Sequence, residues 1–264
     1  MGEVIVITSG KGGVGKTTAA ANIGATLAKN GRKTVIIDMD LGLRKLDIAI
    51  GIADKVVYNV VDVIKNRCSL PDALIKDSRF GELYILPASQ SENKLAVSPD
   101  EMKALCRELS SLFDYVIIDS PAGVERGFEN SVVGADSAII VVVPEPASLR
   151  DADRIADILN DEYDIRKIKV LINRYRPLLA ERGVTPKIDA IISILRVGII
   201  GVVAEDDSVI TAAANSRPVI SEPQSIAARC FMNTARRIAG ADIPLEKFQN
   251  DGLLKRIIKA IHKQ

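Results

Sequence analysis

Histidine and cysteine are scarce in this sequence of 264 residues, and each shortage narrows the chemistry that the protein can perform. The one histidine, His262, cannot build a histidine metal cluster or a catalytic triad. The three cysteines, Cys68, Cys106 and Cys230, are odd in number, far apart and set in apolar or helical surroundings. They indicate buried, reduced thiols and a cytosolic protein, and they offer no paired ligands for an iron–sulfur cluster.

Long apolar runs and an excess of charge of one sign are also missing. No run approaches the ~18 residues of a membrane span, and we expect no cleavable signal, because the first residues read as a strand. The formal net charge is +1, so the composition does not favour a nucleic-acid partner held by phosphate contacts. Residues 253–264 hold four lysines and arginines and no acid, which leaves −3 for residues 1–252.

Apolar stretches recur along the first 241 residues, with helical patterns between most of them. They are apolar throughout rather than alternating, which indicates strands covered on both faces. We therefore predict an α/β fold, with a doubly wound, mostly parallel sheet flanked by helices. We find no repeat, and we divide the chain into a domain at 1–241, a tether at 242–251 and a terminal helix at 252–264. The predicted strands are Val4–Thr8, Thr34–Asp38, Leu83–Pro87, Tyr115–Asp119, Ala138–Val143, Lys169–Asn173 and Gly198–Val203.

The first predicted strand leads into a phosphate-binding loop with an additional lysine at its second position, Gly10-Lys11-Gly12-Gly13-Val14-Gly15-Lys16-Thr17-Thr18. Glycines allow successive backbone N–H groups to converge on phosphate oxygens. Lys16 can reach the terminal phosphates, and the Thr17 hydroxyl can ligate magnesium. A predicted helix from Thr18 to Lys29 supplies the setting that such a loop requires. The loop therefore predicts nucleotide binding.

Polar residues follow three of the predicted strands, at the sheet edge where ligands of open α/β sheets bind. Asp38 ends the second strand and Asp40 follows it, Asp119 ends the fourth, and Asn173 and Arg174 stand at the end of a later one. An acid beside a phosphate loop can hold magnesium through water, and a second acid two residues on can orient an attacking water. Each acid alone is more typical of a strand-end cap or a turn former, but their joint placement at one sheet edge favours a magnesium and nucleotide site.

Several segments of the chain resemble the MinD/ParA family of ATPases, which carries a deviant Walker A loop. Lys11-Gly12-Gly13-Val14-Gly15-Lys16-Thr17-Thr18 is similar to that loop. The segments that begin at Asp38 and Asp119 are similar to the two switch segments of the MinD members. The resemblance continues through Pro144 to Arg154 and spans nearly the whole chain. It implies a P-loop fold that binds ATP and Mg²⁺ and hydrolyses ATP.

The resemblance also implies roles for matching residues. Lys11 would cross an ATP-dependent homodimer to the partner's phosphates, Lys16 would neutralise the β- and γ-phosphates, and Asp40 would help to activate water. Thr17 would ligate Mg²⁺ directly, with Asp38 and Asp119 supporting its water shell. Asn173 and Arg174 resemble the adenine-recognising segment, and the Asn-Lys-x-Asp pattern of common GTPases is absent, which favours ATP. Ala204 departs from the family, where a proline usually precedes the acidic pair.

Partners are implied by the family as well. The MinD members recruit a MinC-like inhibitor of division to the membrane, and a MinE-like protein or a polar scaffold regulates hydrolysis. Arg44, Arg150, Asp151 and Asp153 are candidates for such contacts. Charged residues on a helix face are commonly surface residues that contact only water. The same interpretation applies to a lysine in an exposed loop, such as Lys11.

The C-terminal residues form a basic amphipathic pattern. In a helix, the aliphatic side chains fall within an arc of about 140°, and the cations lie opposite. This pattern is typical of a helix in an anionic membrane interface, although a helix docked on its own domain has the same pattern. We expect a peripheral protein of the cytoplasm and the inner face of the cell membrane. The aliphatic residues are Leu253, Leu254, Ile257, Ile258 and Ile261, and the nearby cations are Lys255, Arg256 and Lys259.

Three other functions remain open from the sequence. A ParA-like partition ATPase would bind DNA through a basic stripe, which the charge of −3 over residues 1–252 disfavours. A flagellar-number regulator of the same group would share the tail and differ in its partners. An iron–sulfur carrier of related fold would need paired cysteines, which the three scattered thiols do not supply.

Overall fold

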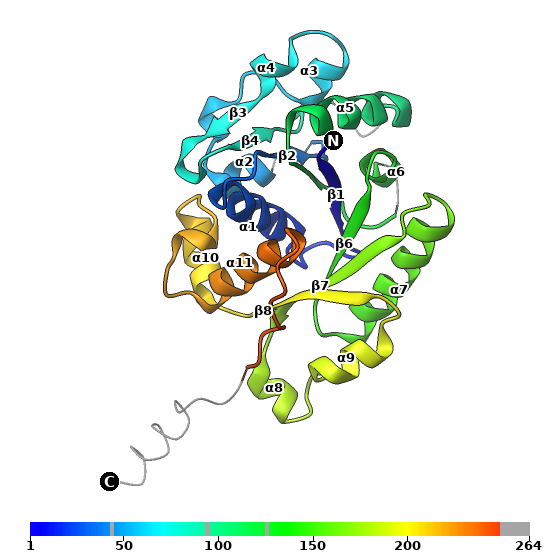
Figure 1. Ribbon diagram of the computed structural model, residues 1–264, viewed down its shortest axis with the longest axis vertical. Helices are drawn as coiled ribbons and strands as arrows, with labels where there is room; N and C mark the ends of the chain where they lie inside the picture. The colour runs from blue at the N-terminus through cyan, green and yellow to red at the C-terminus, as the bar shows by residue number, and fades with distance from the viewer. Residues whose placement is uncertain (43–44, 93–95, 125–126, 249–264) are drawn as a thin grey trace.

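A single twisted sheet organises the chain, whose computed structural model describes residues 1–42, 45–92, 96–124 and 127–248 (Figure 1). These residues form an eight-stranded sheet in the order β3-β4-β2-β5-β1-β6-β7-β8. All neighbouring strands are parallel except β3, which pairs antiparallel with β4. The strands are β1 (Glu3–Thr8), β2 (Thr34–Asp38), β3 (Ile75–Asp77), β4 (Leu83–Leu86), β5 (Tyr115–Asp119), β6 (Ser137–Val142), β7 (Lys167–Tyr175) and β8 (Gly198–Ala204).

The predicted doubly wound sheet is confirmed, and all seven predicted strands are present. Sequence reasoning missed β3 because this edge strand has three residues, too few to show a pattern. The central strand β1 is buried on both faces. Val4 and Val6 of β1 belong to one core layer, whereas Ile5 and Ile7 belong to the other.

Helices cover both faces of the sheet (Figure 1). The Ile5 layer packs against α1 and α11, and the Val4 layer packs against α5 and α7. The Ser98 side chain and Glu101 form a capping box at the start of α5, as the Ser-Pro-Asp-Glu pattern predicts. The helices are α1 (Lys16–Lys29), α2 (Lys45–Ile50), α3 (Val60–Ile64), α4 (Leu70–Ala73), α5 (Pro99–Leu112), α6 (Phe128–Val132), α7 (Pro146–Asp161), α8 (Pro177–Glu181), α9 (Ile188–Ile194), α10 (Asp207–Ala214) and α11 (Ile226–Ile238).

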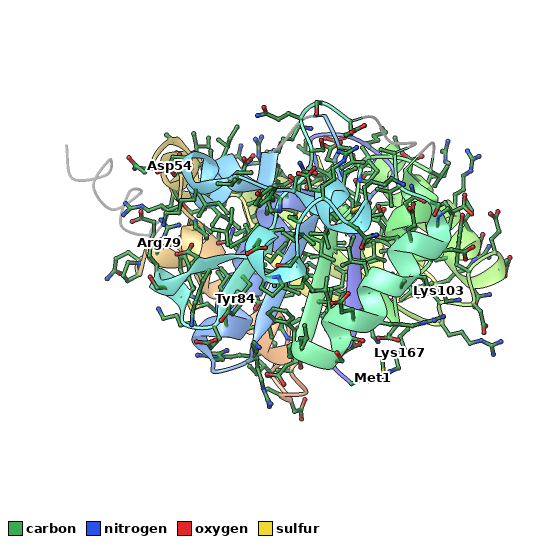
Figure 2. All side chains as sticks on the ribbon, turned by 90° about the horizontal axis from the view of Figure 1, so that it is seen from above. Met1, Asp54, Arg79, Tyr84, Lys103 and Lys167 are labelled. Carbon is green, nitrogen blue, oxygen red and sulfur yellow. The ribbon has the colours of Figure 1, made fainter. Side chains whose placement is uncertain are left out.

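The parallel strands bring all their carboxyl ends to one edge of the sheet. Figure 2 shows Met1, which precedes β1, and Lys167, which begins β7, on one side of the molecule, with Asp54 on the other. Chain connections reverse direction on either side of β1, and open α/β sheets bind ligands at such a switch point. Across the described residues, no helix has the length and apolar character that crossing a membrane requires. The predicted terminal helix lies outside the described residues.

Candidate nucleotide-binding site

The phosphate-binding loop joins β1 to α1 at this edge. Gly13 and Gly15 have φ of 80° and 101°, in the left-handed region that favours glycine. A Cβ atom added at Gly15 would also lie 2.3 Å from the amide nitrogen of Asn173. Because α1 begins directly after Gly15, its first N–H groups and its positive dipole end face the loop. The loop is therefore a ready-made anion site.

Lys16 is buried at the start of α1, and its Nζ donates to the Ser9 hydroxyl over 3.0 Å. Burial lowers the pKa of this ammonium group, whereas the carboxylates of Asp119 and Asp40 raise it. The Ser9 hydroxyl in turn donates to the Lys11 carbonyl over 2.7 Å. The backbone of Lys11 is thereby fixed, while its side chain remains exposed. One lysine of the loop is thus buried in the site, and the side chain of the other is exposed.

Two buried carboxylates end the neighbouring strands β2 and β5, where Asp38 and Asp119 are paired in register. Asp38 accepts hydrogen bonds from the backbone N–H groups of Asp40 and Leu46, at 2.9 and 3.3 Å. Burial raises its pKa to about 6. Both oxygens of Asp119 are buried and have no hydrogen-bond partner in the described part of the chain.

Burial and the adjacent Asp38 raise the pKa of Asp119 to about 8, because the charged form loses water and meets a second acid. The Thr17 hydroxyl and the Lys16 ammonium lower this pKa, but neither completes a hydrogen bond to the carboxylate. An unpaired buried carboxylate beside a hydroxyl and a phosphate loop fits a hydrated divalent cation. Within the described ranges, no three His, Cys, Asp or Glu side chains gather into a metal cluster. The arrangement thus fits Mg²⁺ held by Thr17, phosphates and water.

Asp40 lies two residues beyond β2, and the Lys45 ammonium at the start of α2 binds its carboxylate at 3.0 Å. The side chain of Asp40 is 14% exposed, and that of Lys45 is 55% exposed. Sequence reasoning missed Lys45, because nothing in the motif indicates that its side chain pairs with Asp40. A half-exposed ion pair contributes little stability, so water can compete for the Asp40 carboxylate and phosphate for the Lys45 ammonium.

Asn173 and Arg174 lie at a β-bulge in β7. The register of β7 against β8 shifts between Ile172 and Tyr175, and Arg174 has a φ of 54°. Such bulges redirect side chains near functional sites. The buried Asn173 amide donates to the Val14 carbonyl over 2.7 Å, whereas Arg174 is exposed. In this structure Asn173 therefore positions the phosphate loop.

A cavity of about 360 Å³ lies beside this bulge, where the predicted adenine-recognising residues Asn173 and Arg174 meet the loop. Gly15 and Thr18 line it together with Arg174, Ala204 at the end of β8 and Ile210 of α10. The Arg176 guanidinium, which also lines it, forms two hydrogen bonds with Glu205, one of 2.8 Å from Nη2 to Oε1. Asp206 caps α10 and accepts hydrogen bonds from Ser225 and from backbone N–H groups, which hold its pKa at about 2. Sequence reasoning noted Ala204, but missed the pairing of Arg176 with Glu205, which are far apart in sequence.

The candidate partner residues of α7 lie near the loop. A Cβ atom added at Gly10 would lie 2.4 Å from the Cβ of Asp151, so these residues are in close contact. Arg150 is exposed, and one oxygen of Asp153 is buried without a hydrogen-bond partner among the described residues. Arg44 and the terminal residues 253–261 lie outside the described residues. The close contact of Asp151 with Gly10 is therefore what connects α7 with the nucleotide site.

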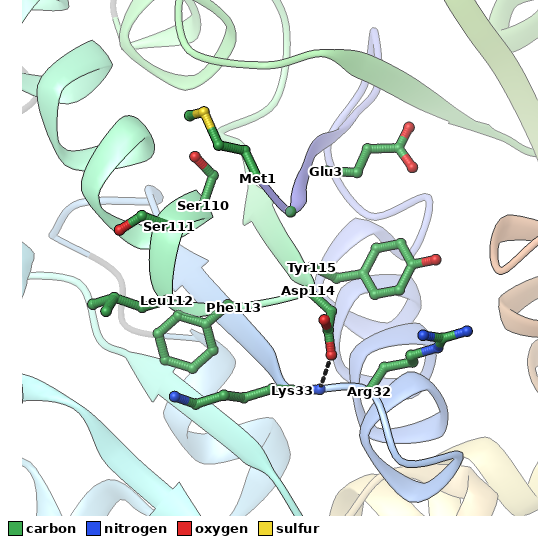
Figure 3. A pocket seen from close by; sticks show the side chains of 11 residues that line it. Met1, Glu3, Arg32, Lys33, Ser110, Ser111, Leu112, Phe113, Asp114 and Tyr115 are labelled. Atoms are coloured by element: carbon green, nitrogen blue, oxygen red, sulfur yellow. Dashed lines mark hydrogen bonds between the residues drawn. The ribbon is translucent and has the colours of Figure 1, made fainter.

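A second cavity, of about 460 Å³, lies at the opposite edge of the sheet (Figure 3). Arg32, Lys33 and Asp114 line it, and the Asp114 carboxylate accepts from the backbone N–H of Lys33 over 2.7 Å. This edge carries the amino ends of β1 and β5 and has no phosphate loop. Its larger volume therefore does not make it the nucleotide site.

A substitution pair separates loop positioning from base recognition. We expect Asn173→Ala to weaken binding of ATP and of inorganic tripolyphosphate by the same factor, roughly tenfold, because it leaves the Val14 carbonyl unpaired. We expect Arg174→Ala, on the base side, to weaken binding of ATP alone. Isothermal titration of both ligands measures this. A loss confined to ATP in the Asn173 variant would contradict loop positioning.

The phosphate loop, the buried lysine and two neighbouring buried carboxylates lie together at the switch point of a parallel sheet. This arrangement defines a P-loop nucleotide-binding ATPase domain. A model of the AAA domain family matches residues 2–171. MinD of Bacillus subtilis, a septum site-determining protein, is 46% identical over 260 residues, which are 97% of each chain. The chain therefore belongs to the MinD family of septum site-determining ATPases.

Solved structures agree with this assignment. The MinC:MinD cell division protein complex of Aquifex aeolicus matches with a TM-score of 0.87 and 40% identity, over 93% of this chain and 98% of that one. The septum site-determining protein MinD of Pyrococcus horikoshii, complexed with Mg-ADP, matches with a TM-score of 0.82 and 29% identity, over 92% and 100% of the two chains. The family resemblance predicted from the sequence is thereby confirmed.

Proposed function

We propose that this ATPase binds ATP with Mg²⁺, dimerises, attaches to the inner face of the cell membrane through residues 252–264, and recruits a division inhibitor that places the septum. Hydrolysis of ATP then releases it. The observation that carries the proposal is the unpaired, buried carboxylate of Asp119 between Asp38 and Lys16, beside a phosphate loop. The family relationship supports the same nucleotide and metal, because the relative from Pyrococcus horikoshii is complexed with Mg-ADP.

Each residue of the site has a physical task in this proposal. The N–H groups of the loop bind phosphate oxygens, and Lys16 moves from Ser9 to the terminal phosphates. Thr17 would hold Mg²⁺, with Asp38 and Asp119 accepting hydrogen bonds from its water ligands. The bound ion would supply positive charge against the negative charge on the phosphates. Asp40 orients the attacking water, and release from Lys45 frees its carboxylate to do so.

The partners follow from the family and from charge. The Aquifex aeolicus complex holds a MinC with a MinD, which supports a MinC-like inhibitor as a partner here. A MinE-like protein or a polar scaffold stimulates an otherwise slow hydrolysis. A single terminal helix binds anionic lipid weakly, and two helices presented by a dimer gain from effective concentration. Nucleotide state thereby controls membrane attachment.

The dimer is testable through Lys11, whose exposed side chain reaches outward from a fixed backbone. We expect the full chain to sediment as a dimer with ATP and Mg²⁺ and as a monomer with ADP. Lys11→Ala loses the dimer but keeps ATP binding, because its side chain acts on the partner's phosphates. Lys167→Ala, an exposed lysine at the amino end of β7, is the control. An ATP dimer that survives Lys11→Ala would overturn the role of Lys11, and a monomer under all conditions would overturn the proposal.

A further inference from the structure

Helices α8 and α9 expose aliphatic side chains that the core does not use. Ile191 of α9 is fully buried and Leu195, which follows the helix, is 6% exposed, whereas Ile192 and Ile194 are 45% and 50% exposed. Leu178 of α8 is 45% exposed, and Val184, between the two helices, is 67% exposed. We call Leu178, Val184, Ile192 and Ile194 the α8–α9 face. Helices α8 and α9 lie together at one end of the molecule (Figure 1).

Residues 242–248, which the sequence assigns to the tether, are fixed on the body beside this end, and we call them the strap. The Arg237 guanidinium of α11 donates to the carbonyls of Ile243, over 2.8 Å, and Pro244 of the strap. It also donates to the Ile200 carbonyl of β8 and to the Glu246 carboxylate, both at 3.0 Å. The side chains of Arg237 and Glu246 are only 7% and 9% exposed. A buried, multiply bonded pair of this kind holds the strap in one position.

The strap lies next to α8 and α9. The ring of Phe248 packs on Tyr175 at the end of β7, with ring centroids 5.5 Å apart. The strap, α8 and α9 together line a groove of about 630 Å³, to which Ile192 contributes. The predicted terminal helix starts at Gly252, four peptide units beyond Phe248, and four units span at most about 14 Å. The terminal helix therefore begins within about 14 Å of Phe248, which lines the same groove as Ile192 of the α8–α9 face.

Because the terminal helix begins near the α8–α9 face, a membrane that has bound this helix lies on the same end of the protein. We propose that the α8–α9 face is a second membrane-contact surface, which inserts its aliphatic side chains among anionic lipid headgroups when the terminal helix is bound. The proposal rests on the proposed membrane attachment. Amphipathic surfaces bind the headgroup region through apolar burial and cations. The exposed cations Arg182, Lys187 and Arg196 outnumber the exposed acids Glu181 and Asp189 along 177–197.

The test measures binding of the full chain, with ATP and Mg²⁺, to vesicles of phosphatidylglycerol and phosphatidylcholine in equal parts. The variant is Ile192→Gln with Ile194→Gln, and the control is Val57→Gln, whose side chain is 78% exposed after η1 (Ala53–Lys55). The double variant and the control are also made in a lengthened chain, with about twelve Gly and Ser residues inserted after Asp251. This insertion separates the terminal helix from the strap by about 20 Å.

With the native spacing, we expect the isoleucine variant to bind vesicles roughly tenfold more weakly, and Val57→Gln to bind unchanged. In the lengthened chain, the isoleucine variant and its parent bind alike, because the face is no longer held at the membrane. Equal binding of variant and parent at native spacing would overturn the second surface alone. Loss of ATP-dependent dimers in solution by the isoleucine variant would overturn it in favour of a second copy as the occupant. An unsubstituted chain that never binds vesicles would overturn membrane attachment itself.

Discussion

Replacing Lys16 with methionine abolishes ATP hydrolysis, with an expected loss of roughly 10²- to 10³-fold. The ammonium group is the cation that the structure places against the terminal phosphates, since it lies buried at the start of α1 and is held by a single hydroxyl. Methionine has a similar length and no charge, so the variant loses attraction for phosphate without losing volume. Hydrolysis is measured by phosphate release with ATP and Mg²⁺.

The thermal stability of the same variant is a second measurement, and we expect it not to fall although hydrolysis does. Burial disfavours the Lys16 ammonium, so an apolar side chain leaves the nucleotide-free protein at least as stable as before. We expect an unchanged or raised Tm without nucleotide, and no rise in Tm when ATP and Mg²⁺ are added. Lys29→Met, at the exposed end of α1, is the matched control and changes neither quantity. A lower Tm without nucleotide, together with normal hydrolysis, would mean that Lys16 is structural.

Asp119→Asn produces the second large effect, because Asp119 is an unpaired, buried acid. We expect hydrolysis with Mg²⁺ to fall roughly 10- to 100-fold, as for residues that orient metal-bound water. The nucleotide-free protein becomes more stable at pH 8, since the neutral amide carries no buried charge. Asp157→Asn, on the exposed face of α7, leaves both unchanged. Normal hydrolysis in Asp119→Asn would contradict the proposed metal site.

The pH dependence of stability follows from the same groups. The pKa of Asp119 is raised to about 8 and that of Asp38 to about 6, above the ~3.9 of an unfolded aspartate. Between about pH 4 and pH 8 the folded protein holds more protons than the unfolded one, so stability falls as pH rises. Asp119→Asn flattens that fall in thermal unfolding without nucleotide or Mg²⁺. A Tm that rises over this range would show that these carboxylates are paired in solution.

The phosphate loop and the strand-end acids were predictable from the sequence, because both are local patterns tied to regular elements. Gly13, Gly15, Lys16 and Asp119 need only the order of strand, loop and helix to be placed. The fold followed for the same reason, since uniformly apolar strands need helices on both faces.

The contacts that depend on distant segments were not predictable. Asn173 donates to the carbonyl of Val14, which is 159 residues away in the sequence, and no local pattern indicates that the two segments meet. The strap reads as a tether for a similar reason. Its seven residues show no helical or strand periodicity, and the contacts that hold it, to Arg237 of α11 and to Tyr175 of β7, come from distant segments.

The central claim, that nucleotide state controls membrane attachment through residues 252–264, is tested most directly by sedimentation with anionic vesicles. The full chain and a chain that ends at Gly252 are each compared with ADP and with ATP plus Mg²⁺. The account predicts that only the full chain with ATP and Mg²⁺ sediments with the vesicles. A full chain that binds ATP but stays in the supernatant would contradict it, and DNA would then be the surface to test.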